Sequence, residues 1–201
     1  MQPETAKVNI DDSVLVERCK SGDSQAFERL IIKYQNRIYN VILKICANPD
    51  DSAELTQETF VKVIENIDRF EGRSGFYTWV FRIAVNLALS FCQRNLKLGL
   101  KSLDSENDEN EDVKGSLKHY LADETADDPS QIAANSELVQ LVQNALLRLD
   151  DHQRSVIVLR DIESMSYAQI AEVLNIEVGT VKSRLSRARN GLREILESII
   201  E

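Results

Sequence analysis

Apolar residues recur at intervals of three and four in two blocks of this chain, and that spacing constrains the fold more than any other feature. In residues 12–98 it runs through a long stretch that includes Leu30, Tyr34, Ile38 and Ile45, and it returns in residues 131–200. This interval is the signature of one face of an α-helix. Only 6% of residues are aromatic, and seven Gly and three Pro are few for the turns of a β-sandwich or barrel. We therefore expect an all-α protein.

Breaks in the first block divide it into several helices in series. The sequence NPDD at 48–51 interrupts the spacing, and Asp51 with Glu54 resembles a capping box for a new helix. After a second break at 71–75, Ser74 can cap a helix that runs to about Asn95. We expect residues 12–98 to form one helical domain behind a flexible tail, residues 1–11.

The second block predicts helices over 132–149 and 151–162, followed by two more. Ser166 with Gln169 fits a capping box, residues 175–179 form a tight connection, and the last helix continues to the end of the chain. Between the blocks, residues 101–130 carry ten acids and three lysines and lose the apolar spacing. Such a segment buries too little apolar surface to offset its ordering entropy. We predict a flexible acidic linker over 99–130 and a second domain over 131–201. For the linker, a simple tether is favoured over an acidic segment that competes with DNA for basic surfaces.

The net charge of −9 disfavours nucleic-acid binding only when it is taken globally. Residues 1–95 and 151–201 each sum to −1 (12 basic against 13 acidic, and 7 against 8), whereas residues 96–150 sum to −7 (5 against 12). Within 178–193 there are five basic side chains and no acid. Screening limits each charge to a reach of about 8–10 Å, so this local excess matters more to a polyanion than the total.

The remaining composition favours a soluble, cytoplasmic protein without membrane insertion. No apolar run approaches the roughly 18 residues of a membrane span, and the first residues do not resemble a signal peptide. The three cysteines, Cys19, Cys46 and Cys92, are widely spaced and lie in helical patterns. We favour inert core thiols in a reducing compartment over a redox role.

The last helix separates an apolar stripe from a basic face when its residues are placed 100° apart. The stripe comprises Val178, Val181, Leu185, Ala188, Leu192 and Ile195, and the opposite face comprises Lys182, Ser183, Ser186, Arg187, Asn190 and Arg193. A capped helix, a tight turn and a helix with such a face indicate a helix-turn-helix that inserts its second helix into the major groove. Thr180, Lys182 and Ser183 lie near enough to the helix start to reach base edges, while the longer cations contact phosphates. A solvated amphipathic helix is the alternative on charge alone.

These residues also carry a family resemblance. The segment SYAQIAEVLNIEVGTVKSRLSRAR (Ser166–Arg189) resembles region 4 of bacterial RNA polymerase sigma factors of the extracytoplasmic-function group, in the sigma-70 family. Upstream, LDDHQRSVIVLRDIESMS is similar to the family pattern LPxxQRxxxxLRxxxGxS, with Asp150 in place of Pro and Ser164 or its neighbour in place of Gly. The resemblance implies that this domain reads the upstream promoter element. The residues assigned to that contact are Gly179, Thr180, Lys182, Ser183, Arg184, Ser186 and Arg187.

The first domain resembles region 2 of the same family. AELTQETFVKVIENIDRF (Ala53–Phe70) is similar to the segment that grips a coiled coil of the largest polymerase subunit, which implies docking through Glu54, Gln57, Glu58 and Phe60. GFYTWVFRIAVNLALSFCQRN (Gly75–Asn95) is similar to the segment that melts and holds the downstream element. Holding an unstacked base requires aromatic stacking and a pocket. The residues implied for the downstream element are Phe70, Phe76, Asn86 and Arg94; Trp79 is expected in the core.

The chain departs from the family where Asn86 usually begins the pattern Asn-x-x-x-Asp-x-x-Arg. Here Ser90 and Gln93 occupy the acidic and basic positions, and we expect Arg94 and Lys97 to substitute for the missing cation. The resemblance further implies core RNA polymerase, including its flap region, promoter DNA and an anti-sigma factor as partners.

The sequence favours neither an enzyme nor a bound cofactor. It holds no phosphate-binding glycine motif, and its two histidines, His119 and His152, lack partners at metal-ligand or catalytic spacing. We predict a sigma factor that brings core polymerase to promoters and assists strand opening. A helix-turn-helix regulator that works without polymerase is the first alternative, and a helical interaction protein without DNA contact is the second.

Overall fold

Short polar residues cap the starts of several helices in the computed structural model, which describes residues 11–102 and 140–200. The helices of the first part are α1 (Asp12–Lys20), α2 (Ser24–Cys46), α3 (Pro49–Asn66), the short 3-10 helix η1 (Ile67–Arg69) and α4 (Phe76–Ser102). The second part holds a helix over 140–147, then α6 (Asp151–Ile157), the π-helical turn η3 (Val158–Ile162), α7 (Tyr167–Leu174) and α8 (Val178–Ile200). No strand occurs among these residues.

The caps explain where several helices begin. The Asp23 carboxylate accepts from the backbone N–H groups of Gln25 and Ala26 at 2.9 and 3.2 Å, which satisfies two orphan donors of α2. The predicted capping box of Ser166 and Gln169 is confirmed, with both reciprocal bonds present at 2.9 and 3.2 Å.

Two of the expected helix boundaries are wrong. α3 begins at Pro49, because the Asn48 side chain caps it and proline suits the first helical position, so Asp51 and Glu54 form no capping box. α4 begins at Phe76 and continues to Ser102, beyond the expected end near Asn95.

The chain's two departures from the family motif are accommodated by the local backbone. Asp150, in place of proline, caps α6 by accepting from the backbone N–H of Gln153 at 2.9 Å. Ser164, in place of glycine, adopts a left-handed conformation with φ of 56°, two residues after the π-helical turn ends at Ile162. A left-handed residue at this point explains the glycine preference, because a β-carbon there is mildly strained.

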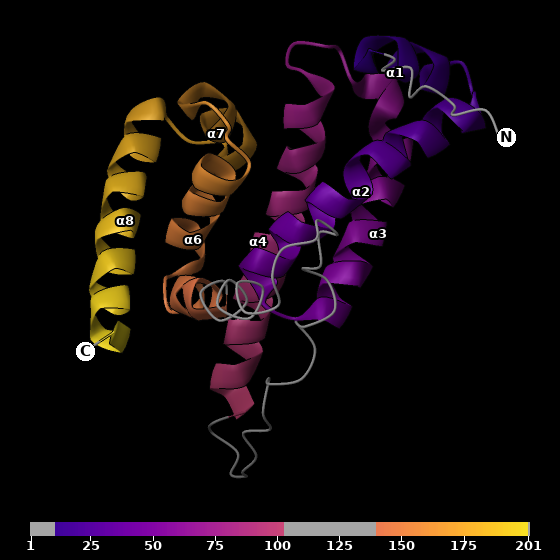
Figure 1. The fold of residues 1–201 in the computed structure, drawn as a ribbon. Helices are drawn as coiled ribbons and strands as arrows, with labels where there is room; N and C mark the ends of the chain where they lie inside the picture. The colour runs from indigo at the N-terminus through magenta and orange to yellow at the C-terminus, as the bar shows by residue number, and fades with distance from the viewer. Residues whose placement is uncertain (1–10, 103–139, 201) are drawn as a thin grey trace, which may run out of the picture.

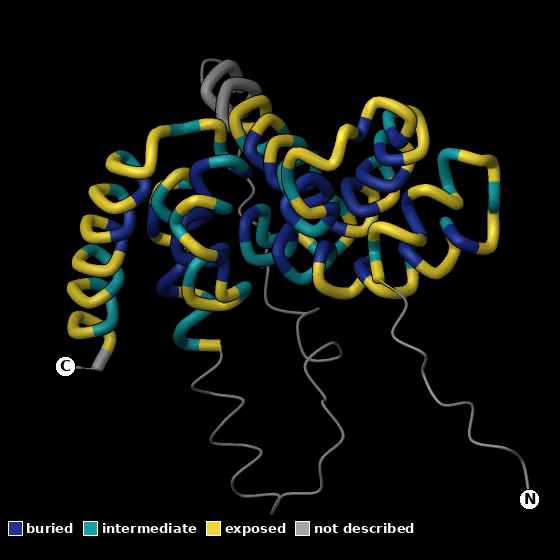
Figure 2. Tube along the Cα trace, turned by 90° about the horizontal axis from the view of Figure 1, so that it is seen from above, coloured by how far each residue is buried: buried dark blue, intermediate teal, exposed yellow. Residues whose placement is uncertain are grey.

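Helices α1–α4 form one helical domain and residues 140–200 form another, and the two pack together (Figure 1). α7 lies against α4, while α6 and α7 together separate α4 from α8, which forms one edge of the molecule. Buried residues face inward across this junction and belong to one continuous apolar cluster (Figure 2). Its largest fully buried side chains include Phe81 and Leu30 of the first domain and Leu159 and Met165 of the second.

Polar contacts fix the two domains at one point of this junction. The Glu163 carboxylate, only 7% exposed, accepts from the Arg37 guanidinium at 2.8 Å and from the Tyr77 hydroxyl at 3.0 Å. Gln169 of α7 also donates to the Thr78 hydroxyl at 3.5 Å. Burial and the nearby Glu163 charge raise the pKa of Tyr77, and burial lowers the pKa of Lys44, which lies near the same carboxylate. The π-helical turn and the left-handed residue after it therefore aim one carboxylate into the junction.

The proposed tail lies outside the described residues except for Asp11, which caps α1. The linker expected over 99–130 also falls outside them from residue 103 on, and its first residues, up to Ser102, continue α4 as helix instead. The start of the helix expected at residue 132 lies outside as well.

Candidate nucleic-acid interface

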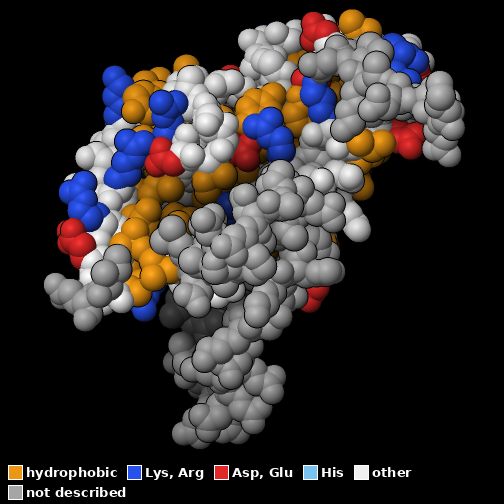
Figure 3. Space-filling model, viewed as in Figure 1, with side chains coloured by type: hydrophobic (Ala, Val, Ile, Leu, Met, Phe, Trp, Pro, Cys, Tyr) orange, Lys and Arg blue, Asp and Glu red, His pale blue; other side chains and the backbone are white. Residues whose placement is uncertain are grey.

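α8 presents its basic side chains on the side that faces away from the rest of the protein. Val181, Leu185 and Ala188 are buried against α6 and α7, so the opposite face is turned to solvent. In the space-filling view, Lys and Arg side chains follow the outer edge of α8 (Figure 3). Of the residues expected to contact the upstream element, Gly179, Lys182, Ser183, Ser186 and Arg187 are exposed, and Thr180 and Arg184 are half-buried.

The cations on this face have no acidic partner in the described part of the chain. No ion pair there involves Lys182, Arg184 or Arg187, and the Arg187 guanidinium donates only to the Ser183 carbonyl, at 3.3 Å. Arg189 differs, because it pairs with Asp161 at 2.5 Å and so ties α8 to the π-helical turn. Unpaired cations on a rigid helix are suited to phosphate oxygens, which accept charge-assisted hydrogen bonds.

The first two residues of α8, Val178 and Gly179, are both exposed. Val178, the first residue of α8, is 39% exposed and therefore does not belong to the buried stripe. A β-carbon on Gly179 would meet no atom within 4 Å, so the fold itself does not require glycine there. Glycine lets another backbone approach closely, which is how a phosphate chain meets the start of a helix.

A second stripe of polar residues runs along α4. Asn86, Ser90, Gln93 and Arg94 are all exposed and recur at intervals of three and four, so they share one side of the helix. The Arg94 guanidinium donates to the Ser90 carbonyl at 3.3 Å. The side chain of Lys97 lies outside the described part of the chain. Asn86 and Arg94, both expected at the downstream element, are thus brought to one accessible face.

Phe70 and Phe76 do not lie on an accessible face. They are 9% and 4% exposed, and their ring centroids lie 5.0 and 5.7 Å from that of Trp79. Tyr34 of α2 closes the cluster at 5.6 Å from Phe76. In this conformation neither ring is open to stack on a base, since both are buried within this aromatic cluster. Trp79 is in the core, as expected.

α3 presents a mixed polar and apolar surface beside this stripe. Glu54 and Gln57 are exposed, and Glu58, half-buried, pairs with Lys62 at 3.4 Å. Phe60, expected on the same surface, is 7% exposed and packs in the core instead. Its place is taken by two residues that the motif did not single out, Val61 and Ile64, which are 51% and 54% exposed. Their spacing from Gln57, four and seven residues, could have identified them.

The surfaces of α3 and α4 meet in a groove of about 290 Å³. Glu54 and Glu58 line it from α3, and Arg94 and Asn95 line it from α4. Asp51, Leu55 and Phe91 complete the lining. Residues that the family resemblance assigns to two different partners therefore border one depression.

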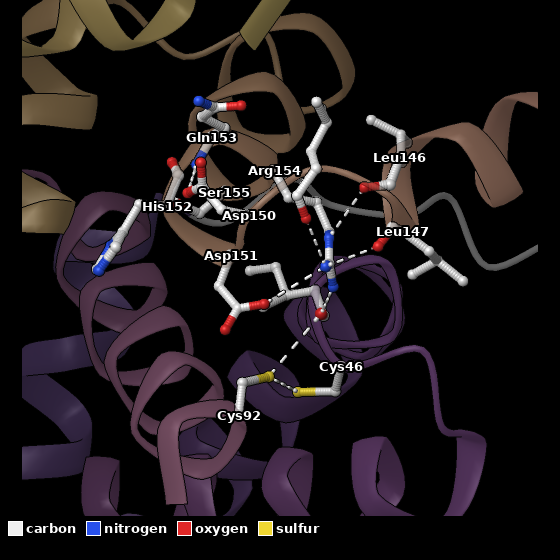
Figure 4. Close-up of polar contacts among 12 residues, drawn as sticks. Cys46, Cys92, Leu146, Leu147, Asp150, Asp151, His152, Gln153, Arg154 and Ser155 are labelled. Carbon is white, nitrogen blue, oxygen red and sulfur yellow. Dashed lines mark hydrogen bonds and ion pairs between the residues drawn. The ribbon is translucent and has the colours of Figure 1, made fainter. Parts of the chain in front are cut away.

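Arg154 is a structural residue whose role the sequence did not indicate. The residue is only 8% exposed. Its guanidinium donates to the backbone carbonyls of Leu146, Leu147 and Leu149 at 3.1, 3.2 and 2.9 Å. It also donates to the Ile45 carbonyl at the end of α2 (Figure 4). Carbonyls at the end of a helix lack intrahelical partners, and a cation there also matches the helix dipole. Arg154 thus terminates the 140–147 helix and ties it to the first domain.

The described residues include no group of three His, Cys, Asp or Glu that could hold a metal ion. No helix in the part of the chain that the structure describes is long and apolar enough to cross a membrane.

The two domains match two parts of a known class of transcription proteins. Residues 30–97 match the family described as Sigma-70 region 2, and residues 140–192 match Sigma-70, region 4. The chain is 34% identical to the ECF RNA polymerase sigma-E factor of Haemophilus influenzae over 193 residues, covering 96% of each protein. It is 32% identical to that of Escherichia coli over 192 residues, covering 95% of this chain and 97% of the relative.

Two solved structures share the fold. One is CnrH in complex with the cytosolic domain of CnrY, with a TM-score of 0.64 and 25% identity, covering 93% of this chain and 97% of the other. The second is the sigma factor RpoE in complex with the anti-sigma factor NepR from Bartonella quintana, with a TM-score of 0.60 and 26% identity, covering 85% and 96%.

The fold and the basic helix-turn-helix thus define a sigma-70-type transcription initiation factor. Within that class, the chain belongs to the extracytoplasmic-function (ECF) RNA polymerase sigma factors. It is an alternative sigma factor that acts with RNA polymerase, and the hypothesis of a regulator independent of polymerase is not favoured.

Proposed function

We propose that three surfaces of this sigma factor divide its work. The α3 surface (Glu54, Gln57, Glu58, Val61 and Ile64) docks on the coiled coil of the largest polymerase subunit. The α4 stripe (Asn86, Ser90, Gln93 and Arg94) contacts the downstream promoter element, and the start of α8 reads the upstream element. The observation that carries this proposal is the unpaired basic face of α8, which stays exposed while its opposite side is buried.

The α8 surface is tested by comparing two arginines of the same helix. Arg187→Ala removes a cation from the third turn of α8, near the end of the helix that reaches base edges and flanking phosphates. Arg193→Ala removes an exposed cation farther along the helix. We expect Arg187→Ala to weaken binding of the holoenzyme to a promoter and to lower the salt-dependence slope by about 1. Equal effects of the two changes would contradict a reading role confined to the start of α8.

The α3 surface is tested with exposed side chains, because truncating them leaves the core intact. Gln57→Ala with Val61→Ala removes the centre of the proposed docking surface, whereas Ile32→Ala, on α2 and 61% exposed, is the matched control. We expect the double variant to reduce retention of core RNA polymerase in a pull-down several-fold, with its melting temperature unchanged. Retention equal to that of Ile32→Ala would refute docking through α3.

The α4 stripe contains Asn86 and Arg94 on one accessible side, and that side also borders the groove shared with α3. Because the α3 docking surface and the α4 stripe border one groove, docking on polymerase through α3 can be coupled to strand opening at α4. Arg94→Ala tests this: run-off transcripts should fall more on linear promoters than on templates with a pre-opened downstream element.

The partner expected from the family resemblance is an anti-sigma factor. Two sigma-fold structures that resemble this chain were solved as complexes, one of them with an anti-sigma factor by name. We propose a binding protein of that kind for this chain, which competes with polymerase or DNA for the surfaces above. A competition assay tests this: the binding protein should displace purified core polymerase from the purified chain.

The chain contributes specificity and strand opening, and the polymerase it joins carries out the chemistry. We accordingly propose that it has no catalytic activity of its own and works in the cytoplasm, where bacterial RNA polymerase acts. Support comes from its membership of a family of initiation factors. Nucleotide incorporation by the purified chain without polymerase would contradict the first statement.

A further inference from the structure

Two cysteines that lie 46 positions apart in the sequence meet between α2 and α4. Cys46 is the last residue of α2 and Cys92 lies in α4, and their sulfur atoms are 3.6 Å apart (Figure 4). Each sulfur is also within hydrogen-bonding distance of one backbone carbonyl, Ala88 for Cys46 and Ile45 for Cys92, both at 3.9 Å. Both residues are free thiols and only partly buried, so a small oxidant can reach them.

The spacing of the sulfurs is close to that of a bonded pair. A disulfide has an S–S length of about 2.05 Å, so the sulfurs must approach by about 1.5 Å. Rotation about the Cα–Cβ bonds changes a sulfur position by that amount. α2 and α4 already pack against each other, so the approach starts from two adjacent side chains.

The surroundings of the pair differ from those of an inert core thiol. The hydrogen bond between the sulfurs lowers the pKa of Cys92 and raises that of Cys46, so the thiolate forms preferentially on Cys92. The charged groups nearby are Arg154, which favours a Cys92 thiolate, and Asp151 and Asp51, which oppose thiolates. Cys19 is the comparison within the chain: burial and Asp23 raise its pKa, and it makes no hydrogen bond with another sulfur among the described residues.

We propose that Cys46 and Cys92 form a reversible redox pair, which a peroxide oxidises to a disulfide that joins α2 to α4. The Cys92 thiolate attacks the peroxide O–O bond and becomes a sulfenic acid, with release of one water after proton transfer. The Cys46 thiol then attacks the Cys92 sulfur, and the S–O bond breaks to release a second water. Two thiols and one hydrogen peroxide thus give one disulfide and two waters, and a dithiol reductant reverses the change.

The position of the pair connects it to both domains. Cys92 lies between Asn86 and Arg94 on α4, and the residue before Cys46 supplies the carbonyl that binds Arg154 of the second domain. A covalent link here holds the end of α2, and with it that carbonyl, at a fixed distance from α4. The disulfide therefore stiffens the helix of the α4 stripe and the anchor of the second domain together.

The test is a thiol count on the full-length reduced protein before and after treatment with hydrogen peroxide. Maleimide labelling and intact mass should show three free thiols falling to one, and a reductant should restore all three. Peptide mapping should find Cys46 linked to Cys92 and Cys19 free. Cys19→Ser is the matched control, and its two remaining thiols should be lost at the wild-type rate. Cys46→Ser and Cys92→Ser should form no intramolecular disulfide.

Two results would overturn the proposal, and both are measured on the wild-type chain, so they do not depend on the folding of a variant. One is retention of all three thiols under peroxide that oxidises free cysteine. The other is loss of Cys92 to sulfinic acid, or dimers through Cys19, with no linked peptide. Because this readout involves neither polymerase nor DNA, it succeeds or fails independently of the function proposed above.

Discussion

Replacing Arg154 by alanine is the most informative single change to the second domain. The guanidinium donates to four backbone carbonyls, three at the end of the 140–147 helix and one at the end of α2. Removing it leaves those carbonyls without a protein donor at a site where the arginine residue is 8% exposed. The Asp151 carboxylate, 3.4 Å from the guanidinium, also loses its partner.

The magnitude follows from these contacts. A hydrogen bond to a charged group contributes about 1.5–3 kcal/mol, but the four share one cation and are not additive. Removing one member of a buried charged network costs about 3–5 kcal/mol, a large part of the roughly 5–15 kcal/mol that stabilises a whole domain. We expect Arg154→Ala to lower the free energy of unfolding by about 3–5 kcal/mol and the melting temperature by about 10 °C or more.

Thermal unfolding by circular dichroism measures this effect, with Arg148→Ala as the control because Arg148 is an exposed arginine six residues earlier. Arg154→Lys separates charge from shape, since an ammonium cannot span four carbonyls as a planar fork does. It should recover less than half of the loss. If Arg154→Ala melts within 1–2 °C, roughly, of Arg148→Ala, the argument that the guanidinium satisfies these carbonyls is refuted.

Three further predictions follow from the junction, the helix start and the aromatic cluster. Glu163→Gln should loosen the two domains without unfolding either, because it removes the charge that binds Arg37 and Tyr77. Small-angle scattering should then show a larger radius of gyration. An unchanged radius would mean that apolar packing alone holds the junction. Gly179→Ala should leave the free energy of unfolding equal or raise it by up to about 1 kcal/mol, because the added β-carbon meets only open space in the free chain. It should nevertheless weaken promoter binding. Unchanged affinity in a filter-binding assay would rule out a close approach of the DNA backbone. Phe76→Ala should lower the free energy of unfolding by about 3–5 kcal/mol, because it empties a site among Tyr34, Phe70 and Trp79. Phe76→Leu should keep most of the stability and most of the promoter opening. Loss of promoter opening alone in the leucine variant would indicate that Phe76 stacks on a base.

Local patterns in the sequence were enough to predict the helices and the basic chemistry of the last helix. Apolar residues at intervals of three and four and short polar caps are local features, and the capping box of Ser166 and Gln169 depends on four consecutive residues alone. The basic face of α8 is equally local, because a single helix with one buried side must expose the other. The all-α class, the helix-turn-helix and the exposed positions of Asn86, Arg94 and Arg187 could therefore be predicted.

Tertiary structure decided which side of the first-domain helices was free. α3 packs against both α2 and α4, so its buried surface is wider than one stripe and includes Phe60, while Val61 and Ile64 remain outside. Phe70 and Phe76 were expected at DNA but are enclosed. Phe76 meets Tyr34 from another helix, and Phe70 packs against Phe76 and Trp79. A helical period gives the direction of a side chain but not the number of neighbours around the helix.

Contacts between distant segments were likewise decided only by packing. The Arg37–Glu163 ion pair joins residues 126 positions apart, and Arg154 binds a carbonyl 109 positions away. Cys46 and Cys92, which appeared as isolated thiols in the sequence, are neighbours because α2 and α4 lie side by side. Such pairs depend on where two helices cross, and no local pattern in either helix specifies the crossing point.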